Sequence, residues 1–206
     1  MNIIGLKKIK NNLILRVFGS IYRPGHYYST IPNINEVYQF REQISNQSLP
    51  DCINLCVENQ LNILKEFDNF YHEEENRIRT WINSRYTINN NYFIEGDANI
   101  LFGIIKKYSP KRIIEIGSGF SSALMLDINQ KFYNNSIELV FIEPYPEDRL
   151  NQLIYTDDKC EVIKRKVQNI NPALFSSLKE NDILFIDSSH VSKMGSDLNF
   201  ILNDHP

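Results

Sequence analysis

Four short apolar runs in the second half of the chain predict buried β-strands. The gaps between them are long enough to hold a helix, and strands that are apolar throughout are typical of parallel sheets covered on both faces. This spacing favours right-handed βαβ units in one parallel α/β sheet. The predicted strands span Arg112–Ile116, Leu139–Ile142, Glu161–Val167 and Asp182–Ser189.

The first half of the chain has a different pattern. Apolar residues from about Leu55 to Ile82 recur at every third, fourth or seventh position, which predicts one long amphipathic helix. Asparagines at 89–91 then mark a turn. We therefore expect a helical and loop-containing N-terminal region over residues 1–90 and the sheet domain over residues 91–206.

Two segments of the N-terminal region have a pattern of their own. Residues 1–20 mix basic and apolar positions and predict a helix packed on the domain, with a helix on a membrane surface as the alternative. Residues 23–32 contain two prolines, a glycine and adjacent aromatic side chains, and therefore form a loop. His26, Tyr27 and Tyr28 are expected either to cover a substrate pocket as a lid or to fill a groove as anchors.

A glycine turn joins the first predicted strand to the helix that follows it. Gly117, Ser118 and Gly119 allow the backbone to approach a ligand closely, and the free N–H groups at the start of the helix face the ligand. A dinucleotide-binding turn has a third glycine where Ser122 stands. Glu115 would repel a pyrophosphate, whereas its charge suits a ligand with an ammonium or sulfonium group.

The second and third strands contribute polar side chains at their carboxyl ends. Glu143 follows the second strand, and Pro144 and Pro146 force a turn before the next helix. A carboxylate at this edge of an open α/β sheet matches a ribose diol, with an exposed strand-end glutamate as the alternative. Gln168 follows the third strand.

The fourth strand leads into the residues that are the best candidates for catalysis. Asp187 ends the strand and His190 follows three residues later. His190 could serve as a general base, and Asp187 could orient it, contact a cofactor amine or ligate a divalent cation. Alternatively, His190 caps the next helix or bonds the backbone.

The Glu-x-Gly-x-Gly pattern at 115–119 and the Ile-Asp-Ser-Ser-His run at 186–190 resemble class I S-adenosylmethionine (SAM)-dependent methyltransferases. The resemblance is to a branch that methylates oxygen atoms of small molecules and glycans, some members of which use a divalent metal. It covers about residues 22–202 and implies a Rossmann-like sheet of order 3-2-1-4, with SAM as cofactor. The further acidic or His-Asp motif that completes a metal site in this branch is missing, so Asp187 alone is left as a metal ligand.

The resemblance also implies roles for particular residues. Asp97 would lie near the methionine end of SAM, although its position also suits a helix N-cap or first-turn carboxylate. Glu143 would bind the ribose and Gln168 would lie beside the adenine, while Asp187 and His190 would be catalytic. The implied cofactor-binding residues are Asp97, Glu115, Gly117, Ser118, Gly119, Ser121, Ser122, Glu143, Gln168 and Asp187.

A complete class I methyltransferase has about seven strands, whereas four are found here. We therefore expect the C-terminal strands of the fold to be missing from this chain. The fourth strand would then be an edge strand despite its apolar composition, unless another chain in an oligomer covers it. Residues Asp197 to Leu202 are expected to form the helix after this strand.

Composition narrows the range of partners. With 22 basic and 25 acidic residues the net charge is −3, which gives no basic footprint for nucleic acid. The odd set of Cys52, Cys56 and Cys160 indicates reduced thiols, and no apolar run is long enough for a membrane span. We expect a soluble, cytoplasmic protein.

The leading hypothesis is a SAM-dependent O-methyltransferase acting on a small molecule or sugar. One alternative is a catalytically inactive SAM-binding or assembly protein. The other is an NAD-dependent oxidoreductase, against which Ser122 and Glu115 both speak.

Overall fold

A computed structural model describes residues 22–45, 56–73, 78–81, 84–193 and 195–203. The helix predicted within residues 1–20, and Cys52, lie outside these ranges. The chain divides into two compact units. One consists of residues 52–187, the other of residues 1–51 with 188–206, and each unit is described by itself.

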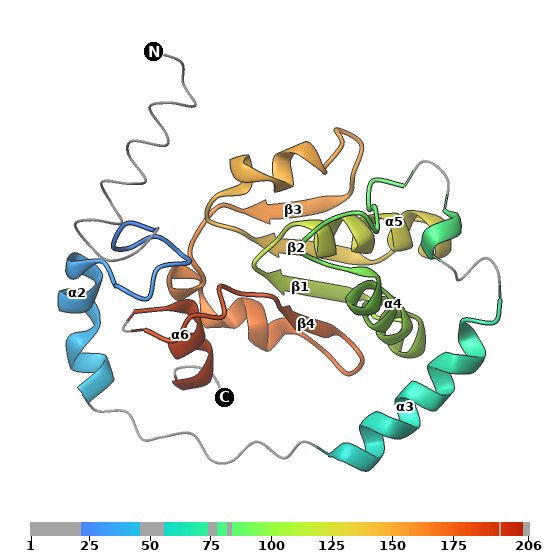
Figure 1. The fold of residues 1–206 in the computed structure, drawn as a ribbon, viewed down its shortest axis with the longest axis horizontal. Helices are drawn as coiled ribbons and strands as arrows, with labels where there is room; N and C mark the ends of the chain where they lie inside the picture. The colour runs from blue at the N-terminus through green and yellow to red at the C-terminus, as the bar shows by residue number, and fades with distance from the viewer. Residues whose placement is uncertain (1–21, 46–55, 74–77, 82–83, 194, 204–206) are drawn as a thin grey trace. The chain divides into compact units, whose positions relative to one another are not determined.

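The larger unit is built on a four-stranded sheet. All three strand pairs are parallel, and the order is β3-β2-β1-β4 (Figure 1). This confirms the predicted Rossmann-like α/β fold and its 3-2-1-4 order. The strands are β1 (Arg112–Ile116), β2 (Glu138–Ile142), β3 (Cys160–Ile163) and β4 (Ile183–Ile186).

The register of the sheet brings the carboxyl ends of the strands level with one another. Ile116 of β1 pairs with Ile142 of β2 and with Ile186 of β4, and Ile142 pairs with Ile163 of β3. Residues that follow different strands therefore meet at one edge of the sheet. Glu143 and Asp187, which directly follow β2 and β4, belong to this edge.

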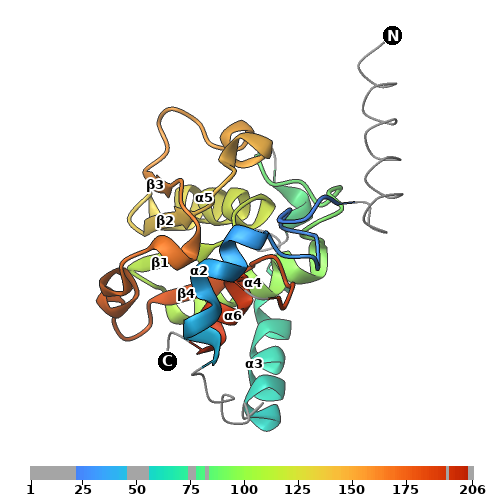
Figure 2. The same cartoon turned by 90° about the vertical axis from the view of Figure 1, so that its left-hand side faces the viewer.

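Two helices lie together on one face of this sheet (Figures 1 and 2). They are α4 (Glu95–Tyr108) and α5 (Phe120–Tyr133), and every residue from 121 to 129 is buried. Each helix ends in a residue with a left-handed backbone, Ser109 and Asn134 respectively. The core between helices and sheet includes Phe102, Ile105, Ile113, Leu124, Met125, Ile128, Leu139 and Phe141.

The prediction of one long helix from Leu55 to Ile82 is wrong after Phe70. The observed helix α3 spans Val57–Phe70, and the 3-10 turn η2 (Ile78–Thr80) follows later. Phe70 and Trp81 both pack on the ring of Phe102, at centroid distances of 5.1 and 5.2 Å. A continuous helix would separate residues 70 and 81 by about 16 Å along its axis, so it could not place both rings on Phe102.

The third and fourth strands are shorter than predicted. β3 stops at Ile163 rather than Val167 because its pairing partner β2 ends at the paired residue, Ile142. β4 begins at Ile183, since the carboxylate of Asp182 accepts the backbone N–H groups of Lys111 and Arg112 at the start of β1. Strand length is therefore set by the partner strand rather than by apolar composition.

The helices expected after β2 and β3 are replaced by short 3-10 turns. Pro146 and Pro172 each begin one of these turns, and short 3-10 segments are common as connectors. The prediction of α-helical crossovers is therefore wrong for these two connections. The turns are η3 (Pro146–Asp148), η4 (Leu150–Gln152), η5 (Val167–Asn169) and η6 (Pro172–Ser177).

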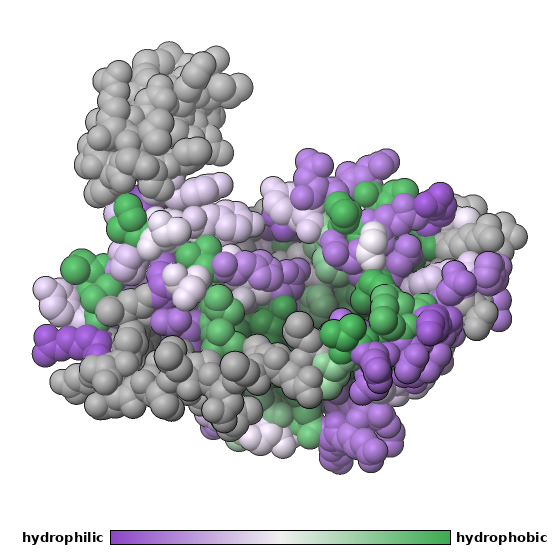
Figure 3. Space-filling model, turned by 60° about the horizontal axis from the view of Figure 1, so that its bottom comes forward, coloured by the Kyte–Doolittle hydropathy of each residue, from purple (hydrophilic) through white to green (hydrophobic). Residues whose placement is uncertain are grey.

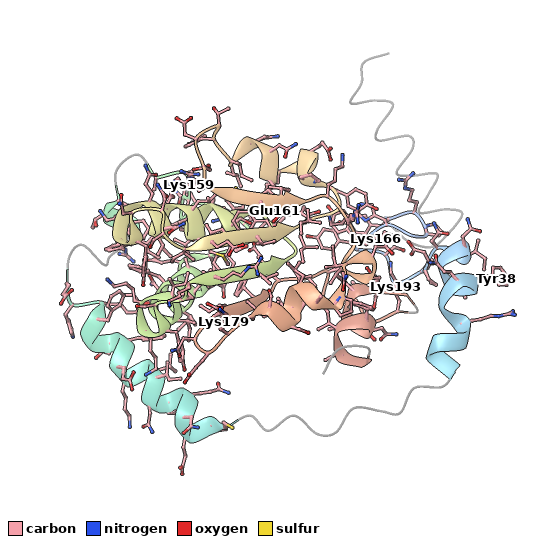
Figure 4. All side chains as sticks on the ribbon, turned by 180° about the vertical axis from the view of Figure 1, so that it is seen from behind. Tyr38, Lys159, Glu161, Lys166, Lys179 and Lys193 are labelled. Carbon is pink, nitrogen blue, oxygen red and sulfur yellow. The ribbon has the colours of Figure 1, made fainter. Side chains whose placement is uncertain are left out.

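The smaller unit contains α2 (Ile34–Ser45), α6 (Asp197–Asn203) and the loop before α2. The helix predicted over Asp197 to Leu202 is confirmed by α6. Lys193 joins the two parts of the sequence in this unit, because its Nζ donates to the carbonyl oxygens of His26 (3.0 Å) and Ser29 (2.6 Å) (Figure 4).

Strand β4 is at the edge of the four-stranded sheet, as predicted. Leu184 and Ile186 remain 40% and 41% exposed. Apolar side chains are visible among polar ones on the face shown in Figure 3.

Among the helices of the described residues, none has the length and apolar character needed to cross a membrane.

A buried ionic network fixes the segment before α4 to the helix α5. The guanidinium of Arg85 contacts the carboxylates of Asp127 on α5 and Asp158 before β3, and it lies 4.4 Å from the ring centroid of Tyr155. The side chains of Arg85 and Asp127 are only 4% and 8% exposed. Asp127 also accepts the backbone N–H of Tyr86.

Removal of the arginine from this network should be costly. We expect Arg85→Ala to lower the free energy of unfolding by about 3–5 kcal/mol, because two largely buried carboxylates lose their cation. The matched control is Arg79→Ala, which removes an exposed ion pair with Glu95 and should cost at most about 1 kcal/mol. Urea unfolding of both variants measures the difference, and equal losses would contradict a stabilising role for the network.

Candidate functional site

The glycine turn connects the end of β1 to the start of α5. Gly117 has a φ of +81°, a conformation that side-chain-bearing residues rarely adopt, and its N–H donates to the carbonyl of Ile142 at 3.0 Å. The N–H of Gly119 donates to Oγ of Ser122 at 3.0 Å. The turn is thereby anchored to β2 on one side and to the first turn of α5 on the other.

Glu115 lies beneath this turn, and its side chain is completely buried. Its carboxyl group accepts hydrogen bonds from the hydroxyl of Ser121 (2.5 Å) and from that of Ser122. Burial raises the pKa of Glu115 to about 8, and the charge of Asp187 adds to this, although the serine hydroxyls act in the opposite direction. The turn therefore covers a carboxyl group that holds its proton near neutral pH.

Glu143 connects the end of β2 to the same turn. Its Oε2 accepts the N–H of Ser118 at 3.1 Å, and its Oε1 accepts the N–H of Tyr145 at 2.8 Å. The side chain is half-buried. The carboxylate predicted to bind ribose is thus held in a fixed orientation beside the turn.

Asp187 follows β4 directly. Its N–H donates to the carbonyl of Ile116 at 2.9 Å, which continues the pairing of β4 with β1. The half-buried Asp187 is close enough to Glu115 to affect the pKa of that residue. Three acidic residues thus meet around the glycine turn, from the ends of β1, β2 and β4.

His190 belongs to the smaller unit, whereas Asp187 belongs to the larger one. The histidine is exposed and has a φ of +56°. It lies between Ser189 and Asp197, which are joined by hydrogen bonds. The N–H and the hydroxyl of Ser189 donate to the carboxylate of Asp197 at 2.7 and 2.6 Å. The pairing of His190 with Asp187 stays a prediction.

Two further predicted cofactor contacts are placed on other elements of the larger unit. Asp97 lies exposed in the first turn of α4, and Gln168 lies half-buried in η5. Their contacts with a cofactor stay predictions. Within the described ranges, no group of three or more His, Cys, Asp or Glu side chains is arranged to hold a metal ion.

The predicted lid residues form an aromatic cluster in the smaller unit. The ring of His26 stacks on those of Tyr22 and Tyr27, with centroid distances of 4.6 and 4.3 Å. Tyr27 and Tyr28 are 39% and 43% exposed. The cluster keeps exposed ring surface while Lys193 holds its backbone, so either a ligand-covering or an anchoring role fits it.

Sequence reasoning did not single out Arg149 or Tyr92. The guanidinium of Arg149 lies over the ring of Tyr92, with its Cζ 3.7 Å from the ring centroid, and beside Gly119. Neither residue stands in a recognisable motif. An arginine shortly after a strand-end acid was the only local signal.

Comparison with known proteins gives one informative match. An uncharacterized protein from Archaeoglobus fulgidus is 39% identical over 194 residues, and the alignment covers 86% of this chain and 86% of that protein. No family model and no solved structure matches the chain.

The raised pKa of Glu115 leads to a testable pH dependence. Between its ordinary value of 4.5 and about 8, the folded protein keeps a proton on Glu115 that the unfolded chain has released. The free energy of unfolding should therefore fall as pH rises through this window, and Glu115→Gln should abolish this part of the fall. One pKa unit is about 1.4 kcal/mol, so we expect a difference of about 1 to 4 kcal/mol between the two proteins from pH 5 to 8.

Urea unfolding at several pH values measures this difference. Ser176→Ala, a change at an exposed site in η6, provides a variant whose pH profile should follow that of the unaltered protein. Parallel profiles for the unaltered protein and Glu115→Gln would mean that Glu115 is ionised in the folded state.

Proposed function

This chain belongs to the same protein family as the uncharacterized Archaeoglobus fulgidus protein, and from its site we propose that it is a SAM-dependent methyltransferase. The supporting observation is the meeting of Glu115, Glu143 and Asp187 around one glycine turn. The carboxylates of Glu143 and Asp187 beside a backbone turn suit a ligand that combines hydroxyl and cationic groups. SAM has both. Glu115, whose charge was expected to attract the cation, instead supports the turn as a buried, protonated group.

Glu143 is proposed to bind the ribose. A carboxylate can accept the two hydroxyl groups of a ribose diol, and that of Glu143 is positioned by the N–H groups of Ser118 and Tyr145. These two bonds also hold the carboxylate still, so little conformational freedom is lost when it accepts hydroxyl groups. Gln168 and Asp97 are proposed to contact the adenine and the methionine end, respectively.

The acceptor is proposed to be a hydroxyl group of a small molecule or sugar. Bound SAM supplies an activated methyl group, so the protein must align the acceptor oxygen and remove its proton. We assign proton removal to His190 and its orientation to Asp187, which could instead hold a divalent cation near the acceptor. His26, Tyr27 and Tyr28 are proposed to contact the acceptor.

Calorimetric titration with S-adenosylhomocysteine tests the cofactor assignment, with NADH as the control ligand. We expect saturable binding of S-adenosylhomocysteine and none of NADH. The reverse result would support the oxidoreductase alternative and overturn the proposal. Binding without methyl transfer to any acceptor would favour a SAM-binding protein without turnover.

The role of Glu143 can be tested by the same titration. We expect Glu143→Ala to weaken binding of S-adenosylhomocysteine by about 1.5 to 3 kcal/mol, the scale of hydrogen bonds to a charged group. The control is Glu147→Ala, a change in the same connection after β2. It removes an exposed carboxylate that pairs with Lys164, and it should leave the affinity unchanged. Unchanged affinity in a folded Glu143→Ala protein would contradict the assignment of Glu143 to the ribose.

A catalytic role of His190 should affect turnover much more than cofactor affinity. His190→Ala should leave the affinity for S-adenosylhomocysteine within about twofold and lower the transfer of labelled methyl from SAM by about 100-fold or more. Transfer is measured against a mixture of alcohols, phenols and sugars. A parallel loss of affinity and turnover would point instead to a structural role for His190.

A further inference from the structure

Arg149 lies between η3 and η4, in the connection that follows Glu143. Its Cζ is 3.7 Å from the ring centroid of Tyr92 and 5.5 Å from that of Phe120. These two rings are themselves stacked, at 6.1 Å and an interplanar angle of 17°. The guanidinium is therefore held by aromatic surface from two other segments, the residues before α4 and the first turn of α5.

This placement puts the charge of Arg149 directly at the glycine turn. A Cβ atom added at Gly119 would lie 3.2 Å from Nη1 and 3.3 Å from Cδ of Arg149. Gly119 thus leaves room for the arginine as well as for a ligand. Its neighbour in the turn, Ser118, is bonded to Glu143, so a cation and an anion flank the same three residues.

Arg149 differs from the other largely enclosed arginines in its partners. Arg85 and Arg112 each contact a carboxylate. Arg149 is half-buried, and the ion pairs and hydrogen bonds found among the described residues do not involve its guanidinium. A guanidinium has five N–H donors in a planar fork that matches a carboxylate with two parallel bonds.

We propose that Arg149 is a binding residue of this site and that it holds the amino-acid carboxylate of the cofactor. The inference rests on the proposed function. One cation and the carboxylates of Glu143 and Asp187 around a single turn complement a zwitterion: the arginine binds the carboxylate, and the two carboxylates attract the ammonium group. Glu115, which keeps its proton beneath the turn, adds no charge to this site. A polyphosphate would meet the same arginine but would be repelled by Glu143 and Asp187.

Stacking prepares Arg149 for this task. The ring of Tyr92 restricts the long side chain to one region before any ligand arrives, so less rotamer freedom is lost on binding. The contact with the ring uses none of the guanidinium N–H groups, which can therefore donate to a carboxylate in the plane of the group. An ammonium group on a lysine would provide the charge without the fork.

Two ligands that differ in the amino-acid portion test the inference. S-adenosylhomocysteine carries the carboxylate, whereas 5′-methylthioadenosine keeps the adenosine and the sulfur but lacks the amino-acid group. Both are titrated calorimetrically into the unaltered protein, Arg149→Gln, Arg149→Lys and Arg165→Gln. Arg165 is an exposed cation after β3 and serves as the matched control.

We expect Arg149→Gln to weaken binding of S-adenosylhomocysteine about 10- to 100-fold and that of 5′-methylthioadenosine less than twofold, the range set by a charge-assisted hydrogen bond. The affinity of Arg149→Lys for S-adenosylhomocysteine should lie between those of the unaltered protein and Arg149→Gln. Arg165→Gln should bind both ligands as the unaltered protein does. A purely structural role would weaken both ligands equally, and a contact with the acceptor would weaken neither. Either result overturns the inference while the cofactor assignment stands.

A different outcome would contradict the proposed function itself. If neither ligand binds the unaltered protein, SAM is not its cofactor and the assignment of Arg149 fails with it. Thermal melting of each variant shows whether the substituted protein is folded. Arg149→Lys, which keeps the charge and most of the side-chain volume, provides a folded comparison if Arg149→Gln melts early.

Discussion

The buried carboxyl group of Glu115 is the constraint on which the site depends. A carboxyl group enclosed by protein is costly without hydrogen-bond partners, and Ser121 and Ser122 provide them from the first turn of α5. These bonds fix the start of α5 over the end of β1, so the connection between them must be very short. A tight turn through Gly117 meets this requirement, and it directs the N–H of Ser118 to the carboxylate of Glu143.

Much of the sheet could be predicted from the sequence because a buried parallel strand is a local apolar run. β1 appears with its predicted bounds, and the strand order agrees with that of the family the chain resembles. Element ends were predicted less well. They depend on partners remote in the sequence, such as Phe102 for the end of α3 and β2 for the end of β3, and periodicity contains no information about those partners.

The same distinction applies to the site. Acidic residues at strand ends could be identified because their position follows from the strand pattern and the turn after it. Arg85 and Arg149 could not, since what matters in each is its neighbours. Arg85 meets Asp127 across 42 positions of sequence, and Arg149 meets a tyrosine from before α4. Neither pairing has a sequence signature, although both help to hold the segments around the glycine turn.

The division of the chain has a consequence for the order of events during protein synthesis. Residues 52–187 form one unit, and they leave the ribosome before residues 188–203 do. The loop that contains His26 and Ser29 must wait for Lys193, which follows them by 167 and 164 positions. At about 5 to 20 residues per second this delay is roughly 10 to 30 s. The sheet unit can therefore be complete while the aromatic loop still lacks the lysine that holds it.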